Sequence, residues 1–132
     1  MKGFTLLEVM IALIIAGLAA AALFEAAGSG LHATRTASLY DQAIVRAKSR
    51  LAAATHGVRL APGEQRGDDG GGFRWHTRVA PVSSVSLRPV GLSGPRAAIT
   101  YPVVLYDVTV WIDWDDSGTH REVRLETEQV GG

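Results

Sequence analysis

The sequence contains no cysteine and no excess of charge of either sign. Without cysteine the chain can form neither a disulfide framework nor a Cys-ligated zinc site, and this absence favours no redox compartment. Thirteen Lys and Arg residues balance thirteen Asp and Glu residues, so net charge gives no argument for binding a polyanion. The 132 residues allow one small domain plus an anchor.

The sequence also lacks the short motifs of common catalytic sites. It has no HxH or HExxH metal motif, no nucleophile elbow and no phosphate-binding loop, because the glycine-rich stretch at residues 68–72 lacks the GxGxxG spacing. The four histidines are scattered along the chain and are interpreted as solvated surface residues: His32, His56, His76 and His120. We therefore expect no enzymatic activity, no catalytic or metal-binding residue, and no cofactor.

One long hydrophobic run dominates the N-terminus. From Phe4 to Phe24 the residues are almost all apolar, and a single acid, Glu8, interrupts them. As a helix the run is roughly 31 Å long, enough to cross the hydrocarbon core of a bilayer. An acid costs about 2.5–3.5 kcal/mol at the centre of such a segment and less near its end, so Glu8 indicates either a function or an interfacial position. A secretory signal peptide cut near Ala27 is another interpretation, but it gives Glu8 no role.

The residues around this acid resemble those of a known family. The stretch GFTLLEV, residues 3–9, resembles the class III signal of type IV pilins and of type II secretion pseudopilins. The resemblance implies that a prepilin peptidase and methyltransferase cuts between Gly3 and Phe4 and then N-methylates Phe4. It also implies that Glu8 pairs with the amino-terminal charge of a neighbouring subunit during assembly.

A second helical pattern follows the apolar run. Gly28-Ser29-Gly30 is a point at which the helix is expected to loosen. Apolar residues then recur at spacings of three and four and predict a face that packs on a sheet, ending near Gly57: Ala37, Tyr40, Ile44, Ala47 and Leu51. Together the two segments predict one long helix, half in the membrane and half in the soluble domain.

The second half of the chain predicts strands. Alternating residues at 73–79 indicate a half-buried strand, and 103–114 with 121–130 indicate an antiparallel hairpin. We predict a loop at 62–72, and an irregular connection at 80–102 with one short strand near 82–87.

These elements predict an α+β, type IV pilin-like fold: a long N-terminal helix, half of it transmembrane, packed on a small antiparallel sheet. The expected parts are a leader peptide at 1–3, a transmembrane and assembly helix at 4–28, and a periplasmic domain at 29–132.

Two features resemble parts of binding sites. The acidic turn Asp113–Gly118 matches the first half of a calcium loop, but Arg124 stands where the bidentate acid belongs, which favours an acidic hairpin turn. Arg74, His76 and Arg78 share a strand face that nucleic acid could contact, but the neighbouring aromatic residues lie on the opposite face. We therefore expect no nucleic-acid partner.

Within the family, the chain most resembles the small I-type minor pseudopilins of type II secretion. The resemblance implies a bacterial inner-membrane protein with a single span and its C-terminal domain in the periplasm. It implies a pseudopilus tip complex with the J and K types, next to the H type and the major pseudopilin, that initiates assembly and helps drive protein export across the outer membrane. The H and J types remain alternatives, as does a minor pilin of a type IV pilus, for adhesion or DNA uptake.

Overall fold

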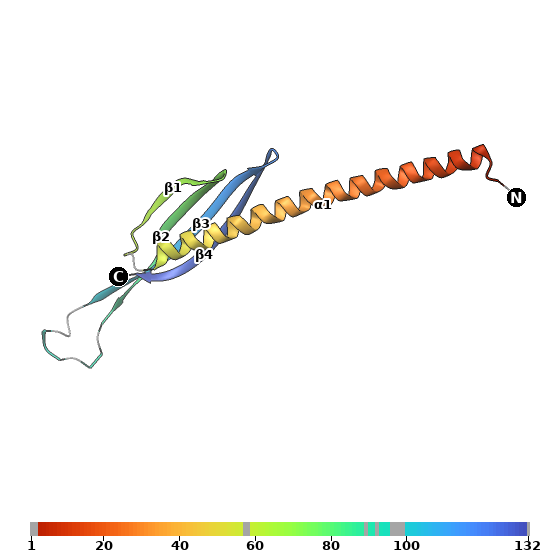
Figure 1. The fold of residues 1–132 in the computed structure, drawn as a ribbon. Helices are drawn as coiled ribbons and strands as arrows, with labels where there is room; N and C mark the ends of the chain where they lie inside the picture. The colour runs from red at the N-terminus through yellow and green to blue at the C-terminus, as the bar shows by residue number, and fades with distance from the viewer. Residues whose placement is uncertain (1–2, 57–58, 89, 92, 96–99, 132) are drawn as a thin grey trace. The chain divides into compact units, whose positions relative to one another are not determined.

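The computed structural model describes residues 3–56, 59–88, 90–91, 93–95 and 100–131 (Figure 1). The chain divides into two compact units, residues 1–39 and 40–132, and each is described by itself. Helix α1, Leu6–Thr55, contributes to both units. The predicted cap at Gly57 lies outside the described residues.

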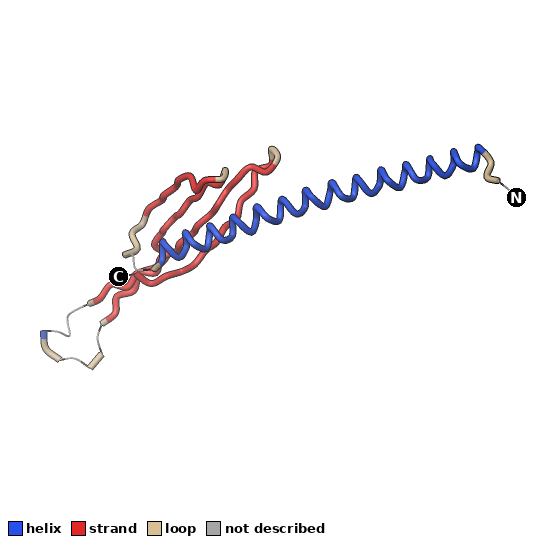
Figure 2. Tube along the Cα trace, viewed as in Figure 1, coloured by secondary structure: helices blue, strands red, loops and turns tan. Residues whose placement is uncertain are grey.

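In the first unit nearly all residues of α1 are exposed. The helix does not loosen at Gly28-Ser29-Gly30 as expected, since helical structure continues through these residues (Figure 2). The Ser29 hydroxyl donates to the carbonyl of Ala26, and the Thr34 hydroxyl donates to the carbonyl of Gly30, at 2.9 Å each. Both hydroxyls thus bond back to carbonyls of the preceding turn, as Ser and Thr do within a continuous helix.

The second unit is a four-stranded antiparallel sheet with the C-terminal part of α1 on one face. The strands are β1 (Gly63–Gly70), β2 (Phe73–Leu87), β3 (Tyr101–Asp116) and β4 (Thr119–Gly131), in the spatial order β1-β2-β3-β4. Each strand therefore pairs with its neighbour in sequence, as in a meander. This arrangement confirms the predicted α+β, pilin-like fold.

The core lies between the helix and the central strands. Phe73 of β2 is one of its buried side chains. The others from the sheet come from alternate positions of β3: Val108, Val110, Ile112 and Trp114. Ala43 and Ala47 of α1 are completely buried, and these small side chains let the helix approach the sheet closely. Tyr40 packs edge-to-face on Trp114, with ring centroids 5.0 Å apart.

The predicted helix face is confirmed for four of its five residues. Tyr40, Ile44 and Leu51 are half-buried and Ala47 is buried. Ala37 is exposed, and Ala43 takes its place in the buried stripe.

The loop predicted at residues 62–72 is wrong. Residues 63–70 form strand β1, which pairs with β2 from Gly63↔Val79 to Gly70↔Phe73. The sequence GEQRGDDG has no apolar alternation, because β1 is an edge strand whose residues are exposed or half-buried. Its backbone pairing and the turn at Gly71 and Gly72, both with positive φ, define it instead.

The short strand predicted near 82–87 is confirmed, but it is the end of β2 and not a separate strand, so the irregular connection is shorter than the predicted 80–102. Strand β2 continues without a break through Pro81 to Leu87, and β3 begins at Tyr101. The pairing register shifts between Pro81 and Ser83, which leaves Val82 as an extra residue on β2. Proline lacks a backbone donor and is tolerated at such a bulge, so Pro81 does not end the strand.

The terminal hairpin is confirmed. Strands β3 and β4 pair at every position from Val104↔Gly131 to Asp116↔Thr119. Ser117 and Gly118 both have positive φ, 51° and 83°, as a tight two-residue hairpin turn requires.

Candidate functional site

The N-terminal segment begins outside the helix. Gly3, Phe4 and Thr5 precede the first helical residue, Leu6, and Phe4 is 84% exposed. The Glu8 backbone N–H donates to the Thr5 hydroxyl at 3.3 Å and to the Thr5 carbonyl at 3.1 Å, so Thr5 is the N-cap. The Gly3–Phe4 peptide bond is therefore exposed non-helical backbone, the form that a peptidase requires.

Glu8 occupies the first turn of α1, three residues after the cap. Thr5 and Glu8 have the spacing of a capping box, and a carboxylate here lies at the positive end of the helix dipole. The Glu8 side chain is exposed, with no partner among the described residues. The helix dipole alone stabilises such a charge by about 0.3–1 kcal/mol, so Glu8 has capacity for a stronger partner from outside the chain.

Apart from Glu8, the surface of α1 from Leu6 to Phe24 is apolar on all sides. Leu6 is 81% exposed, Leu18 68% and Phe24 80%. The helix is long and apolar enough to cross a membrane, and the residues of its most apolar window are not buried within the chain. Such a surface requires lipid or other apolar helices around it.

In the second unit, one carboxylate connects the helix to the β1–β2 hairpin. Asp69 accepts from Arg46 Nη1 at 2.9 Å and from Arg50 Nη2 at 2.5 Å, and its backbone carbonyl accepts from Arg46 at 2.7 Å. The guanidinium groups also lie over aromatic rings, Arg46 over Phe73 at 4.7 Å and Arg50 over Trp75 at 4.4 Å. The Arg50 hydrogen bond, and then Arg46, lower the pKa of Asp69 against the opposing effect of burial. We call these three charged residues the Asp69 clamp.

A second polar network lies on the sheet face opposite the helix, here called the outer face. His76 stacks on Trp111, with ring centroids 4.9 Å apart and the planes 2° from parallel, and hydrogen-bonds Asp113 at 2.8 Å. The interpretation of His76 as a solvated histidine is therefore wrong, since its side chain is only 26% exposed. The other three histidines are exposed.

The acidic hairpin does not offer free carboxylates to a metal. Asp113 is 6% exposed and accepts from Arg74 Nε at 2.6 Å as well as from His76. Asp115 contacts His120 at 3.3 Å and Arg74 at 3.4 Å, and these contacts, His120 first, lower its pKa. Among residues 3–56, 59–88, 90–91, 93–95 and 100–131, no three His, Asp or Glu side chains are grouped as a metal site requires. The Arg and His side chains that already contact these carboxylates disfavour calcium binding.

The basic residues considered for nucleic acid do share the outer face. Arg74, His76 and Arg78 lie there, and Phe73 is buried on the opposite face as expected. Trp111 lies on the basic face, however, which the sequence interpretation missed. The acids of β4 cross the same face beside it, and they oppose the approach of a polyanion: Glu122, Glu126 and Glu128.

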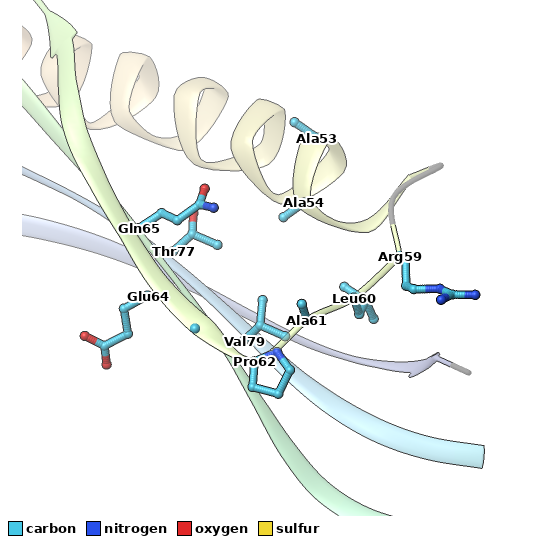
Figure 3. Close-up of a pocket in the computed structure, with 11 residues that line it drawn as sticks. Ala53, Ala54, Arg59, Leu60, Ala61, Pro62, Glu64, Gln65, Thr77 and Val79 are labelled. Carbon is cyan, nitrogen blue, oxygen red and sulfur yellow. The ribbon is translucent and has the colours of Figure 1, made fainter. Parts of the chain in front are cut away.

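A cavity of about 500 Å³ lies where the end of α1 meets β1 and β2 (Figure 3). Figure 3 shows Gln65 and Thr77 directed toward the helix, whereas Glu64 and Arg59 point away from it. The helix contributes only the small side chains of Ala53 and Ala54. The cavity therefore lacks converging acid, base or nucleophile groups.

Comparison with known proteins singles out the N-terminal segment. Residues 1–24 match the family model described as the prokaryotic N-terminal methylation motif. The chain carries the N-terminal methylation motif of type IV pilins and pseudopilins. Over 139 aligned residues it is 27% identical to type II secretion system protein I of Xanthomonas campestris pv. campestris, an alignment that covers 99% of this chain and 95% of that protein. No solved structure matches the chain.

The methylation motif was accessible from the sequence because all of its residues are consecutive. The Asp69 clamp and the Trp111 stack were missed because their members lie 19 to 37 positions apart in the chain. The only sequence signal was the alternation of Arg74, His76 and Arg78 opposite Asp113, which requires the strand register to interpret.

Proposed function

We propose that this chain is an I-type minor pseudopilin of a type II secretion system. The observation that carries the proposal is the methylation motif at residues 1–24 of a chain whose similarity to a type II secretion system protein I extends over 99% of its length. The wide match favours secretion over a type IV pilus, because the motif alone is shared by both groups.

In this proposal the N-terminal segment is processed and then used for assembly. The peptidase cuts the exposed bond between Gly3 and Phe4, and Phe4 becomes the N-methylated first residue. Five residues of the mature chain, Phe4 to Glu8, then hold both an ammonium and a carboxylate at the membrane boundary.

Glu8 of one subunit pairs with the ammonium of its neighbour. Two unit charges 4 Å apart attract by about 4 kcal/mol at an effective dielectric constant of 20. An acid near the end of a spanning segment costs less than about 2.5–3.5 kcal/mol, so one such pair offsets its insertion. The pairing also sets the register of neighbouring helices, since both charges occupy one level of the membrane.

The assembled subunit is a single-pass inner-membrane protein with its C-terminal domain in the periplasm. It joins the J, K and H types in a tip complex that initiates the pseudopilus of the major pseudopilin. The apolar surface from Leu6 to Phe24 supports the spanning role, because it has no protein partner within the described chain. The chain acts as a structural subunit, with no substrate of its own and no nucleic-acid partner.

Secretion by a strain that lacks its own protein I tests this proposal. The full chain should restore export of a folded exoprotein, and Glu8→Ala and Glu8→Gln should reduce export at least tenfold and abolish co-purification with other pseudopilins. Glu25→Gln is the matched control, since Glu25 is the next acid of the same helix and lies just after the apolar run. Wild-type export by Glu8→Ala would rule out the docking role, and failure of the unmodified chain to be cut after Gly3 would rule out the function.

A further inference from the structure

Strands β2 and β3 extend beyond the rest of the sheet as a two-stranded ribbon (Figure 1). Strand β1 pairs with β2 only as far as Val79, and β4 ends where Gly131 pairs with Val104. The pairs Val85↔Val103 and Leu87↔Tyr101 lie past that point, with no third strand beside them in the described chain. An isolated two-stranded ribbon is marginally stable in water, and the described residues supply no third strand to support this one.

The bulge at Val82 gives the ribbon one apolar face. Side chains alternate along a strand, so one extra residue transfers every later side chain of β2 to the other face. Without it, Val85 and Leu87 would continue the helix-facing series of Phe73 and Val79. With it, they lie opposite Val103 and Tyr101, on the outer face.

We call this surface the apolar arm. It combines residues of three strands, because Val130 of β4 pairs with Leu105 on the same face: Val85, Leu87, Tyr101, Val103, Leu105 and Val130. Four of them are more than half exposed, Val85 at 57%, Leu87 at 53%, Tyr101 at 56% and Val130 at 63%. The opposite face of the ribbon is mixed, with Ser84 and Ser86 of β2 facing Val104 and Pro102 of β3. A contiguous apolar patch of this kind on a small domain marks an interaction site.

Acids border the apolar arm where it meets the sheet. Asp107 and Glu128 lie directly opposite each other on the outer face, and Glu126 lies two positions before Glu128 in β4. Like charges at opposed positions repel. Asp107 accepts a hydrogen bond from the Thr109 hydroxyl at 3.1 Å, and neither glutamate has a cationic partner among the described residues. A ligand that covers the arm and brings Lys or Arg to this rim relieves the repulsion.

The acids beside the apolar arm indicate which kind of partner can bind it. A second copy would place acid against acid, so self-association through the arm is disfavoured. An anionic lipid surface is disfavoured for the same reason. A different protein with an apolar stripe and a basic margin matches both parts of the surface.

We propose that the apolar arm is the docking surface for a different pseudopilin subunit, whose contact face is apolar with Lys or Arg at the margin beside Asp107 and Glu128. The inference rests on the proposed function, because it takes the neighbour from the same assembly. It assigns the soluble domain a contact of its own, in addition to those made by α1.

Site-specific photocrosslinking of the full chain in secreting cells tests the inference. p-Benzoylphenylalanine in place of Tyr101 puts a probe of similar shape in the arm, and the same probe in place of Ser86 is the control on the opposite face. We expect the probe at 101 to form an adduct with another pseudopilin at least fivefold more often than the probe at 86. Glu128→Lys should reduce the 101 adduct at least fivefold, whereas Glu122→Lys, on the same face six residues away, should not change it.

The outcomes separate this inference from the function on which it rests. If the chain is cut after Gly3 and restores secretion, but positions 86 and 101 crosslink equally, the docking surface is refuted and the function stands. An adduct dominated by a second copy, by lipid or by the exported protein refutes it as well, as does insensitivity to Glu128→Lys. A chain that is not cut after Gly3 overturns both.

Discussion

Replacing Asp69 with asparagine should destabilise the soluble domain by about 2 kcal/mol. The carboxylate is 15% exposed and accepts hydrogen bonds from two guanidinium groups, and each hydrogen bond to a charged group contributes roughly 1.5–3 kcal/mol. Asparagine keeps the shape but directs one amide N–H₂ group at a guanidinium. The side chains of Arg46 and Arg50 are 29% and 37% exposed, so water replaces part of the hydrogen bonding that the substitution removes. The expected loss of stability is therefore close to that of a single such hydrogen bond.

Denaturant unfolding of the full chain in mild detergent, followed by tryptophan fluorescence, measures this change. All three tryptophans lie in β2 or β3, so the signal reports the sheet and not the apolar helix. Asp41→Asn is the matched control, since it makes the same carboxylate-to-amide change at an exposed position of α1. We expect Asp41→Asn to change the free energy of unfolding by less than about 0.5 kcal/mol.

The pH dependence gives the second half of this prediction. The Arg50 hydrogen bond and then Arg46 lower the pKa of Asp69 in the folded state below its value in the unfolded chain. The stabilisation is therefore fully present above about pH 4 and is lost as the pH falls through the folded-state pKa. The difference between wild type and Asp69→Asn should be constant from pH 5 to 7 and shrink below pH 4. A difference under 0.5 kcal/mol at pH 7, or one that does not shrink on acidification, would refute the role of the Asp69 clamp.

Three further substitutions test the packing of the sheet, each by the same unfolding measurement. Gly67→Ala should cost about 1–3 kcal/mol, because a Cβ there lies 2.7 Å from Nε1 of Trp75, and an unchanged midpoint would show that the ring moves freely. Ser117→Asn should stabilise by about 0.5 kcal/mol, since Asn-Gly is preferred in this turn with positive φ, and a loss of stability would contradict the turn type. Gln129→Ala should cost about 1 kcal/mol, because the Gln129 amide donates to the carbonyl of Thr55 at 2.9 Å and satisfies the end of α1; Gln129→Glu, which lacks that donor, should cost at least as much.

The elements that could be predicted from the sequence are those in which apolar residues recur with the period of a helix or a strand. The apolar run at 4–24, the helical stripe through Tyr40 and Leu51, and the alternation of β3 and β4 each show their burial pattern directly. Strand β1 could not be predicted in this way, because its residues bury little surface and its order comes from pairing with β2. The bulge at Val82 was likewise absent from the prediction, since Pro81 and the serines after it are typical of irregular structure.

The candidate sites also differ in whether their residues are neighbours in the sequence. The methylation motif is local, so seven consecutive residues predict it. The Asp69 clamp, the Trp111 stack and the apolar arm depend on strand register, because each brings together residues from two or three separate elements. The face of Val85 and Leu87 is the clearest example: simple alternation from Phe73 assigns them to the helix side, and one bulged residue reverses that assignment.

Intact mass and N-terminal sequencing of the chain, expressed with its prepilin peptidase, test the central claim most directly. The account predicts a mature protein that begins at N-methylated Phe4, three residues shorter than the translated chain. A Gly3→Ala variant should stay uncut, and Glu8→Gln should still be cut, because in this account Glu8 acts only after processing. A protein that begins after Ala27, or that still begins at Met1 in the presence of an active peptidase, would contradict the account.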